Sequence, residues 1–510
     1  MSNGQEELFE VEGFEKYDSL SREELIRHLK VEKKITALLR KEFTDYISRF
    51  GETGDRLLLI EDQMVWMRNE LFGKSSEKEP KQIQETNPST PKLKISRPQK
   101  LSERYASLPR ISRHLELQEM PDCRCCGGKL SDSGMTENSE YLTVIPKQFF
   151  VVDQKRHKYR CSKCHGDLVT APNLPRITPG GSYSDPMILD VAISKYCDLI
   201  PINRYVKMAE RSGVEGLPPQ SLIGVTHQLA DFLKPVYELL KDEISKEKVL
   251  HADETPHRML EGDETSNWYL WGFSSKKTSY FEAHDTRSGD VASDFLKGIS
   301  CEFLMSDVYS GYAKGVRVAN LVREAVGAAL IQSIYCNAHA RRRFKEAAER
   351  FPDDSQFFID EYKKIYKLES EVKDKPPNEA LELRKQMKAH FEAMKIRAIE
   401  LTPLYPEKSY LSKALSYLVG NYKQLTAFTE NTELPIDNNS QERLLRNPVI
   451  GRKTWYGTHS KQGVETMCVL FSIIESCKLN NINPRTFLPQ LVQDLHEGKA
   501  PYTPVSTLIH

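Results

Sequence analysis

Short β-type runs that alternate with helical segments from residue 248 onward restrict the possible folds of this chain more than any other feature. The segments between them include a helix at 289–297 and a basic helix at 338–350. The β-type runs lie at 248–252, 268–273, 278–283, 302–305 and 331–335. This alternation is typical of an α/β domain with a mixed sheet. We therefore predict a mixed sheet with accompanying helices.

The chain has 510 residues, which is enough for several domains, and its composition changes along its length. We predict a helical or coiled-coil region at 1–72, a basic linker rich in Pro, Ser and Lys at 73–114, and a small cysteine module at 115–172. A helical region follows at 173–245. The α/β domain comes in two parts, at 246–350 and 431–510, with an all-α block at 351–430 between them. In the first region, apolar residues recur every three or four positions. This spacing fits a coiled coil that mediates self-association, or two amphipathic helices packed on their own chain. The region at 173–245 has a helix–turn–helix rhythm around Gly213, which plain helical hairpins share.

Charge and hydropathy exclude several classes of protein. Lys and Arg together number 72, as do Asp and Glu, so a uniformly basic coat for nucleic acid is excluded, although local basic patches are not. No apolar run approaches the roughly 20 residues of a membrane span. The acidic N-terminus is unlike a signal or transit peptide, so we expect a cytoplasmic protein.

Four cysteines form two C-x-x-C pairs, Cys123 with Cys126 and Cys161 with Cys164. Each pair lies on a glycine-containing knuckle, and two such knuckles can bind one structural Zn²⁺ through four thiolates. The alternatives are a disulfide or two unrelated surface pairs. We also expect β-like runs within this module, at 141–145 and 148–153.

A basic run precedes the second cysteine pair. It contains Lys155, Arg156, Lys158 and Arg160 around a tyrosine. This composition suits contact with a phosphate backbone, but exposed strand edges also carry such residues.

Three acidic residues stand out because of their neighbours. Asp253 follows the apolar run 249–252, Asp307 follows the run 303–305, and Glu442 lies in a helix that we expect to end before Pro448. A carboxylate where a buried strand ends is costly unless it binds a cation or a donor. Two aspartates and a glutamate can hold Mg²⁺ or Mn²⁺, the hard ions that prefer oxygen ligands. The alternatives are that the aspartates cap loops and that Glu442 pairs with Arg446 on its own helix.

The chain resembles the large transposase of the insertion sequence 66 family, a DDE-type transposase, over nearly its whole length. The resemblance rests on a series of motifs in order: Leu71-Phe-Gly-Lys-Ser-Ser-Glu-Lys78, the four cysteines, Ser194-Lys-Tyr196, Ile200-Pro-Ile-Asn-Arg204, His251-Ala-Asp-Glu-Thr-Pro256, Asp307-Val-Tyr-Ser-Gly-Tyr312, Cys336-Asn-Ala-His-Ala-Arg-Arg342, Asp437-Asn-Asn439, Glu442-Arg443, Gly451-Arg-Lys453, and the ending Lys478-Leu-Asn480 with Asn483-Pro484. It implies an RNase H-like catalytic domain with Asp253, Asp307 and Glu442 as the metal-binding triad, and a helical insertion between Asp307 and Glu442.

From this resemblance we expect cleavage at transposon ends and transfer of the freed 3′-hydroxyl to target DNA, with Mg²⁺ or Mn²⁺ at the triad. Further basic residues are candidates for phosphate contacts: Arg341, Arg342, Arg443, Arg446, Arg452 and Lys453. A solvated helix face or pairing with the acidic site are the alternatives for these groups. His339 could contact the scissile phosphate or be a satisfied core histidine, and we expect Trp455 to pack in the core.

The expected partners are the transposon end repeats, the target DNA, further copies of the chain and accessory proteins encoded by the same element. No membrane is expected, and the protein should be associated with the nucleoid when it is bound to DNA. Two other functions remain open on the sequence. One is a non-catalytic, zinc-stabilised DNA-binding protein, and the other is a structure-selective nuclease of the same fold.

Overall fold

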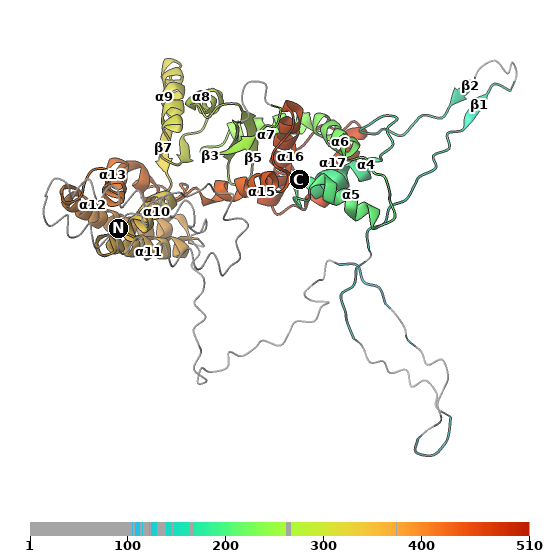
Figure 1. The fold of residues 1–510 in the computed structure, drawn as a ribbon, viewed down its shortest axis with the longest axis horizontal. Helices are drawn as coiled ribbons and strands as arrows, with labels where there is room; N and C mark the ends of the chain where they lie inside the picture. Colours follow the sequence, from blue (N-terminus) through green and yellow to red (C-terminus); the bar gives the residue numbers. More distant parts are fainter. Residues whose placement is uncertain are drawn as a thin grey trace, which may run out of the picture. The chain divides into compact units, whose positions relative to one another are not determined.

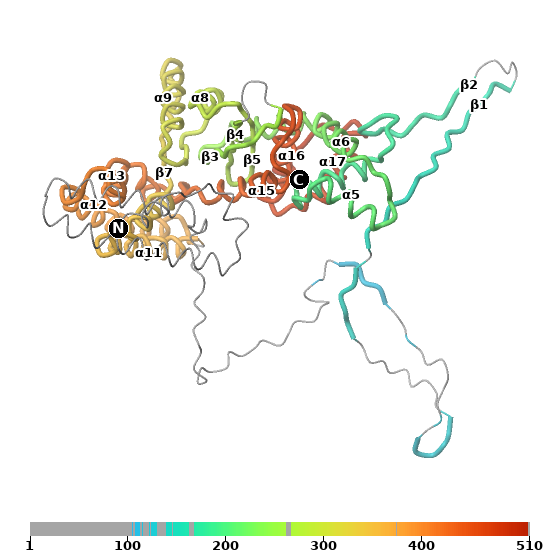
Figure 2. The backbone as a smooth tube through the Cα atoms, in the orientation of Figure 1, coloured from blue at the N-terminus to red at the C-terminus, as the bar shows by residue number. Residues whose placement is uncertain are grey.

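The structure is a computed structural model. It describes residues 105, 108–112, 115, 122, 124–129, 139–144, 146–162, 168–261, 267–373 and 375–508, which appear in colour in Figures 1 and 2. They fall into two units, and the larger unit contains 155–208 and 216–508. The predicted N-terminal helices and most of the basic linker lie outside the described residues.

A five-stranded sheet in the order β5-β4-β3-β6-β7 forms the centre of the larger unit. Its strands are β3 (Val249–Arg258), β4 (Asn267–Ser274), β5 (Ser279–His284), β6 (Phe303–Ser306) and β7 (Gln332–Tyr335). The first three pair antiparallel, whereas β6 and β7 run parallel to β3 and to each other. The predicted mixed sheet is confirmed, and each of the five β-type runs predicted from residue 248 onward forms one strand.

Strand β3 extends further than the sequence indicated. Its parallel pairing with β6 ends at His251, but its antiparallel pairing with β4 continues to Arg258. The expectation that Asp253 follows the end of a strand is therefore wrong, because Asp253 lies within β3 and pairs with Gly272. Beyond His251 the strand has a neighbour on one side only, so Pro256, which has no N–H to donate, is tolerated there.

Helices cover both faces of the sheet. Along β4, Leu270 packs with α16 (Lys461–Leu479), whereas Trp271 and Phe273 pack with α8 (Gly289–Lys297). The following helix, α9 (Ser310–Ala325), packs on α8. Successive residues of a strand point to opposite faces, so the near-continuous apolar run of β4 fills two cores.

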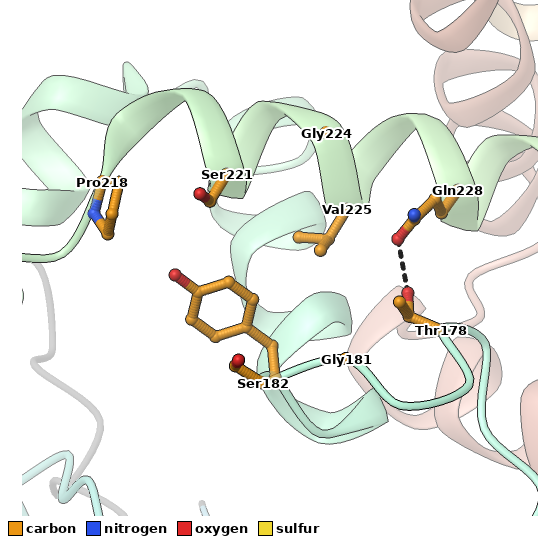
Figure 3. Close-up of a pocket in the computed structure, with 9 residues that line it drawn as sticks. Thr178, Gly181, Ser182, Pro218, Ser221, Gly224, Val225 and Gln228 are labelled. Carbon is orange, nitrogen blue, oxygen red and sulfur yellow. Dashed lines mark hydrogen bonds between the residues drawn. The ribbon is translucent and has the colours of Figure 1, made fainter.

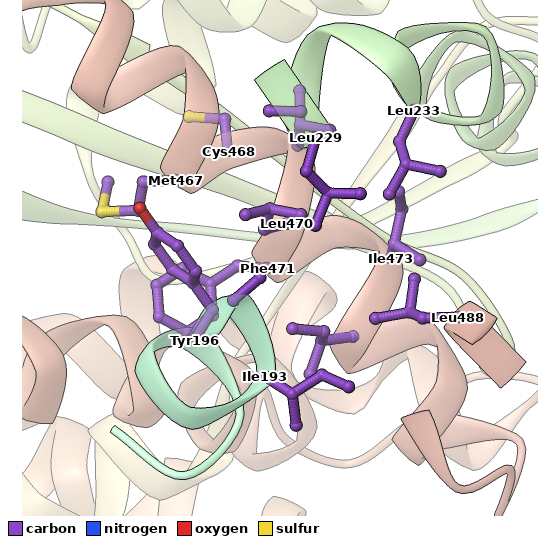
Figure 4. Packing of buried hydrophobic residues seen from close by; sticks show 14 of the residues in the cluster. Ile193, Tyr196, Leu229, Leu233, Met467, Cys468, Leu470, Phe471, Ile473 and Leu488 are labelled. Atoms are coloured by element: carbon purple, nitrogen blue, oxygen red, sulfur yellow. The ribbon is translucent and has the colours of Figure 1, made fainter. Parts of the chain in front are cut away.

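The largest core surrounds α16, which is apolar on nearly all sides. Figure 4 shows Phe471 and Leu470 of this helix among side chains from α4 (Asp185–Tyr196), α6 (Pro219–Phe232) and α17 (Pro484–His496). The ring of Tyr196 meets Phe471 edge-on at 5.6 Å and Trp455 at 6.3 Å. Trp455 therefore packs against this core, as the sequence predicted. The remaining helices of this region are α5 (Ile202–Glu210) and α7 (Lys234–Ser245).

An all-α block follows β7, and it begins with the basic helix that we expected in the α/β domain, because this helix packs with the helices of the block. Its helices are α10 (Asn337–Ala348), α11 (Pro352–Val372), α12 (Pro377–Leu401), α13 (Tyr410–Gly420) and α14 (Tyr422–Thr426). Aromatic side chains dominate its core, with Phe344 stacked on Phe358 and Phe391 edge-on to Phe428. The chain then returns to the sheet through α15 (Asn439–Trp455).

The strands expected in the cysteine module are wrong. The described residues of 141–145 and 148–153 form no strand, and Val144, Phe150 and Val151 are exposed. An alternating run forms a strand only where a neighbour pairs with it, and here none of the described residues does. A short hairpin instead joins β1 (Lys158–Arg160) to β2 (Leu168–Thr170).

Within the described parts of the chain, no helix has both the length and the apolar character that crossing a membrane requires.

Candidate functional site

The alternation of side chains along β3 separates its two neighbouring acidic residues. Asp253 pairs with Gly272, and Glu254 pairs with Trp271, whose side chain packs on the α8 face. Residues paired across antiparallel strands share a face, so Asp253 lies on the opposite face from Glu254. That opposite face is the one against which α15 packs.

Glu254 is neutralised by its own neighbours. Its carboxylate forms an ion pair of 2.6 Å with Arg287 and accepts a hydrogen bond from the hydroxyl of Tyr312. Tyr309 supports the guanidinium, which lies 4.2 Å from its ring centre. Glu254 is thus not available for a cation on the α15 side, although the sequence could not distinguish it from Asp253.

Asp307 directly follows β6, as predicted. Its Oδ1 accepts a hydrogen bond of 3.2 Å from the backbone N–H of Tyr309, just before α9 begins at Ser310. The residue is only partly buried. One carboxylate oxygen is therefore left for a ligand at the edge of the sheet where β6 ends.

Glu442 lies in the first turn of α15, and this helix is attached to β3 at its start. Asn438, the buried residue before the helix, donates from Nδ2 to the carbonyl of Ala252 at 2.9 Å. Its Oδ1 lies 2.8 Å from Nδ1 of the buried His251. Figures 1 and 2 show α15 beside the sheet, although β3 and α15 are far apart in the sequence.

The same helix is attached to β3 at its other end. After α15, the backbone N–H of Thr458 donates to the carbonyl of Arg258 at 3.1 Å, and Leu260 donates back to Thr458 at 2.8 Å. The prediction that the helix ends before Pro448 is wrong, because it continues to Trp455 with Pro448 on its buried face. Packing of that face outweighs the single backbone hydrogen bond that proline removes.

Asp307 and Glu442 act on Asp253 through their charges, although within the described residues the oxygens of the three carboxylates do not all lie within 4.8 Å of one another. Burial raises the pKa of Asp253 well above its ordinary value, and the charges of Glu254, Asp307 and Glu442 raise it further. This repulsion is relieved when a cation binds. The donor set therefore fits a divalent cation with oxygen ligands.

Two residues that the carboxylate pattern did not include lie beside Glu442. His339 places Nδ1 3.9 Å from Oε1 of Glu442, and the buried Cys336 lies with them in one group. His339 is not a satisfied core histidine, because within the described residues its Nδ1 has no hydrogen-bond partner. The C-x-x-H spacing at the start of α10 could have indicated this pair. The alternative that Glu442 pairs with Arg446 finds no support, since no such ion pair exists among the described residues.

The predicted phosphate-binding residues near the site differ in exposure. Arg342, Arg443, Arg446 and Lys453 are exposed, whereas Arg341 and Arg452 are partly buried. Arg341 lies 5.6 Å from the ring centre of Tyr366, and Arg452 lies 3.4 Å from Oγ1 of Thr255 on β3. Three of the exposed residues, Arg443, Arg446 and Lys453, therefore lie on the same helix as Glu442.

The basic run at the hairpin is exposed throughout. Lys155, Arg156, Lys158 and Arg160 all lie on the surface, and Arg156 donates to the carbonyl of Ala171 at 2.7 Å. This placement is compatible with both a nucleic-acid contact and a solvated strand edge.

Only part of the predicted zinc site can be described. Cys126 is exposed and Cys161 is partly exposed, whereas Cys123 and Cys164 lie outside the described residues. The four-cysteine zinc site stays a prediction.

A separate pocket of about 410 Å³ lies in the helical region at 173–245. Figure 3 shows Ser221, Gly224 and Gln228 on one side of α6 facing the loop that carries Thr178, which donates a hydrogen bond to Gln228. None of the residues that line it was predicted to act in catalysis or metal binding.

Comparisons with known proteins agree with this architecture. Residues 180–466 match the model of the transposase IS66 family, and residues 121–165 match the zinc-finger binding domain of transposase IS66. The uncharacterized protein y4hP of Sinorhizobium fredii is 25% identical over 407 residues, covering 75% of this chain and 72% of its own length. The uncharacterized protein y4jD of the same organism is 24% identical over 419 residues, covering 79% and 80%. The first family match spans more than half of the 510 residues and contains the sheet, the all-α block and α15, so the chain belongs to the transposase IS66 family.

Proposed function

We propose that this transposase cleaves DNA at transposon ends and joins the freed 3′-hydroxyl to target DNA, with Asp253, Asp307 and Glu442 as the ligands of divalent cations. The observation that supports this most is the raised pKa of Asp253, which is due first to burial and then to the charges of Glu254, Asp307 and Glu442. The neighbouring Glu254 has an arginine and a tyrosine as partners on the opposite face of the sheet, so it is not counted among the ligands.

We also propose that the catalytic domain is RNase H-like. The strand order β5-β4-β3-β6-β7, with three antiparallel strands followed by two parallel ones, is the arrangement we expect of that fold. The all-α block lies between Asp307 and Glu442, as expected of a helical insertion.

The ligand residues come from three separate elements, so the site forms only when β3, β6 and α15 pack together. Bound Mg²⁺ or Mn²⁺ would supply Lewis-acid activation of the attacking hydroxyl group and of the scissile phosphate. The exposed Arg443, Arg446 and Lys453 on α15 would bind phosphates on either side of the reacting one.

The remaining parts of the chain support binding of DNA. We propose that Cys123, Cys126, Cys161 and Cys164 hold a structural Zn²⁺, and that Lys155, Arg156, Lys158 and Arg160 contact the DNA backbone near it. Such contacts weaken with salt, because each one releases condensed counterions. Self-association through the N-terminal region, with accessory proteins from the same element, is part of the same proposal.

The experiment is an end-cleavage and joining assay with Asp253→Asn in the full chain. The variant keeps the shape of the side chain but loses its charge, so cleavage in Mg²⁺ should fall by about 10³-fold, which corresponds to several kcal/mol of lost stabilisation. Binding to the transposon ends should be retained. The matched control is Asp294→Asn, which removes an exposed carboxylate on α8 that forms a short-range ion pair with Lys297.

Cleavage by Asp253→Asn at the rate of the control would rule out the triad. Absence of cleavage in the wild-type protein, with end binding intact, would indicate a non-catalytic DNA-binding protein. Cleavage without a 3′-hydroxyl joining product would indicate a structure-selective nuclease.

A further inference from the structure

Beside the carboxylates, the side chains of Cys336, His339 and Glu442 form a second group of possible metal ligands. One atom from each residue, a sulfur, an imidazole nitrogen and a carboxylate oxygen, lies within 4.8 Å of the other two. Cys336 directly precedes α10 and His339 lies in its first turn, so the C-x-x-H spacing brings both to the same end of the helix. Glu442 reaches them from the first turn of α15.

The sulfur of Cys336 has surroundings that suit a coordinating thiolate. The backbone N–H of Asn438 donates to Sγ at 3.2 Å. A metal ion displaces the proton of a coordinating thiol outright, and hydrogen bonds to the sulfur then stabilise the thiolate.

The imidazole of His339 is also available. Its Nδ1 is shielded from solvent and has no hydrogen-bond partner in the described part of the chain. Oε1 of Glu442 lies 3.9 Å away, too far for a hydrogen bond. A nitrogen in this position is satisfied by a ligand that also binds the carboxylate.

We propose that Cys336, His339 and Glu442 form a site for one thiophilic divalent ion of the Zn²⁺ class. Sulfur, nitrogen and oxygen donors together favour Zn²⁺ over Mg²⁺, since Mg²⁺ prefers oxygen alone. Three protein ligands leave the fourth tetrahedral position open. Zn²⁺ bound here is distinct from Zn²⁺ in the four-cysteine module, with which it shares no residue.

Because Glu442 belongs to both groups, Zn²⁺ at this site withdraws a ligand from the cations of the proposed triad. Zn²⁺ therefore antagonises cleavage supported by Mg²⁺. This consequence rests on the proposed function, whereas binding of Zn²⁺ to the group does not.

The first experiment measures binding alone. The full chain is dialysed against buffered Zn²⁺ without Mg²⁺, and its zinc content is determined by elemental analysis. The wild-type protein should hold one equivalent more than Cys336→Ser and than His339→Asn. Cys197→Ser, which changes a half-buried thiol at the end of α4, serves as the matched control and should keep the wild-type content.

Circular dichroism shows whether each variant is folded. Of the two site variants, His339→Asn should disturb folding less, since Nδ1 of His339 has no hydrogen bond within the described residues that the substitution could break. Equal zinc content in the wild-type protein and either site variant overturns the three-residue site.

The second experiment titrates Zn²⁺ into end cleavage at fixed Mg²⁺. Each protein is normalised to its own activity without Zn²⁺. Half-inhibition of Cys336→Ser should require at least about ten times more Zn²⁺ than half-inhibition of the wild type and of Cys197→Ser, the loss expected when a metal site is weakened. Equal sensitivity overturns the antagonism. If no protein cleaves, the proposed function fails, while the zinc content still decides the binding site.

Discussion

At the scale of single residues, Gly272, the partner of Asp253 on β4, lies in a closely packed position. A methyl group at this position would lie 2.2 Å from Nε2 of Gln441 and 3.0 Å from the ring of Phe281. Gln441 is fully buried and directly precedes Glu442. The absence of a side chain at Gly272 thus allows the first turn of α15 to approach β4 next to Asp253.

The first prediction concerns this contact. Gly272→Ala should lower the free energy of unfolding by about 1–3 kcal/mol, the usual cost of overpacking a core. It should also reduce cleavage, because Gln441 and with it Glu442 must shift. Adding Gln441→Ala should restore much of both losses, since it removes the clashing amide. Urea denaturation and the cleavage assay give the double-mutant cycle.

Gly298→Ala is the control for Gly272→Ala, because an added methyl group there meets no atom within 4 Å. Strictly additive effects of Gly272→Ala and Gln441→Ala would show that the two residues do not constrain each other.

His257 gives a prediction about pH. Burial, together with the charge of Arg452, lowers the pKa of His257 from 6.5 to about 4, and its Nε2 lies 3.0 Å from Oγ1 of Thr458. The unfolded chain therefore binds a proton below pH 6.5 that the folded chain does not bind until about pH 4. Stability is lost as the pH falls through this window, by about 2 kcal/mol between pH 7 and pH 5.

His257→Gln keeps a polar group near Thr458 but does not titrate. The difference in unfolding free energy between the wild type and this variant should shrink by the same amount from pH 7 to pH 5, as measured by urea denaturation. A difference that does not change with pH would contradict the lowered pKa.

At this scale the sequence identified the acidic residues but not their partners. Asp253 and Glu254 are adjacent and chemically alike, and only their pairing with Gly272 and Trp271 assigns them to opposite faces. Arg287 and Tyr312, which neutralise Glu254, come from segments whose approach depends on the packing of the helices on the sheet. Local patterns carry no information about such contacts.

At the scale of elements, α15 is positioned by its attachment to β3 at both ends. Asn438 binds Ala252 and His251 at the start, and Thr458 binds Arg258 and Leu260 after the end. Local rules predicted that the helix stops before Pro448, because a proline disfavours the helical conformation of the residue that precedes it. These two attachments and the buried face of the helix show why the local rule fails here.

The third prediction tests the attachment at the start of α15. Asn438→Ala leaves the carbonyl of Ala252 and the ring of His251 without this partner, which should lower the unfolding free energy by about 1–3 kcal/mol. Cleavage should fall further than this loss of stability explains, because Glu442 is only one helical turn away. Binding to the transposon ends should be nearly unchanged.

The control is Asn483→Ala, which removes the side-chain cap of α17 and should cost about 1 kcal/mol without affecting cleavage at temperatures where the protein is folded. If both asparagine variants lose activity in proportion to stability, Asn438 has no positioning role.

At the scale of the whole molecule, the order of strands and helices was predictable. The contacts between the all-α block and the segment that leads back to the sheet were not. Apolar periodicity predicted both the mixed sheet and the helices of the all-α block. It could not show that the block shapes the segment leading to Glu442. Asn337, at the start of α10, donates from Nδ2 to the carbonyl of Ile436 at 3.0 Å, and the hydroxyl of Tyr366 donates to Asp437 at 3.1 Å.

Arg384 of α12 makes the strongest connection of this kind. Its guanidinium is buried, is paired with Glu369 at 2.6 Å, and donates to the carbonyls of Phe428, Asn431 and Leu434. These carbonyls belong to the turn that leads from the helical block to Asp437 and α15. The block therefore fixes the path by which the chain brings Glu442 back to the sheet.

The last prediction follows from this arrangement. Arg384→Met keeps most of the apolar volume but leaves Glu369 and three carbonyls without their donor, so it should lower the unfolding free energy by about 3–5 kcal/mol. Arg397→Met is the control, because Arg397 is more exposed and its ion pair with Asp354 should contribute at most about 1 kcal/mol. Limited proteolysis should cut the first variant, and not the second, within 428–436. If Arg384→Met resists proteolysis within 428–436 but still loses DNA-cleavage activity, the guanidinium affects the reaction by some means other than holding this turn. If Arg384→Met still cleaves DNA at the full rate although protease cuts the turn, Glu442 is positioned by the attachments of α15 to β3 alone.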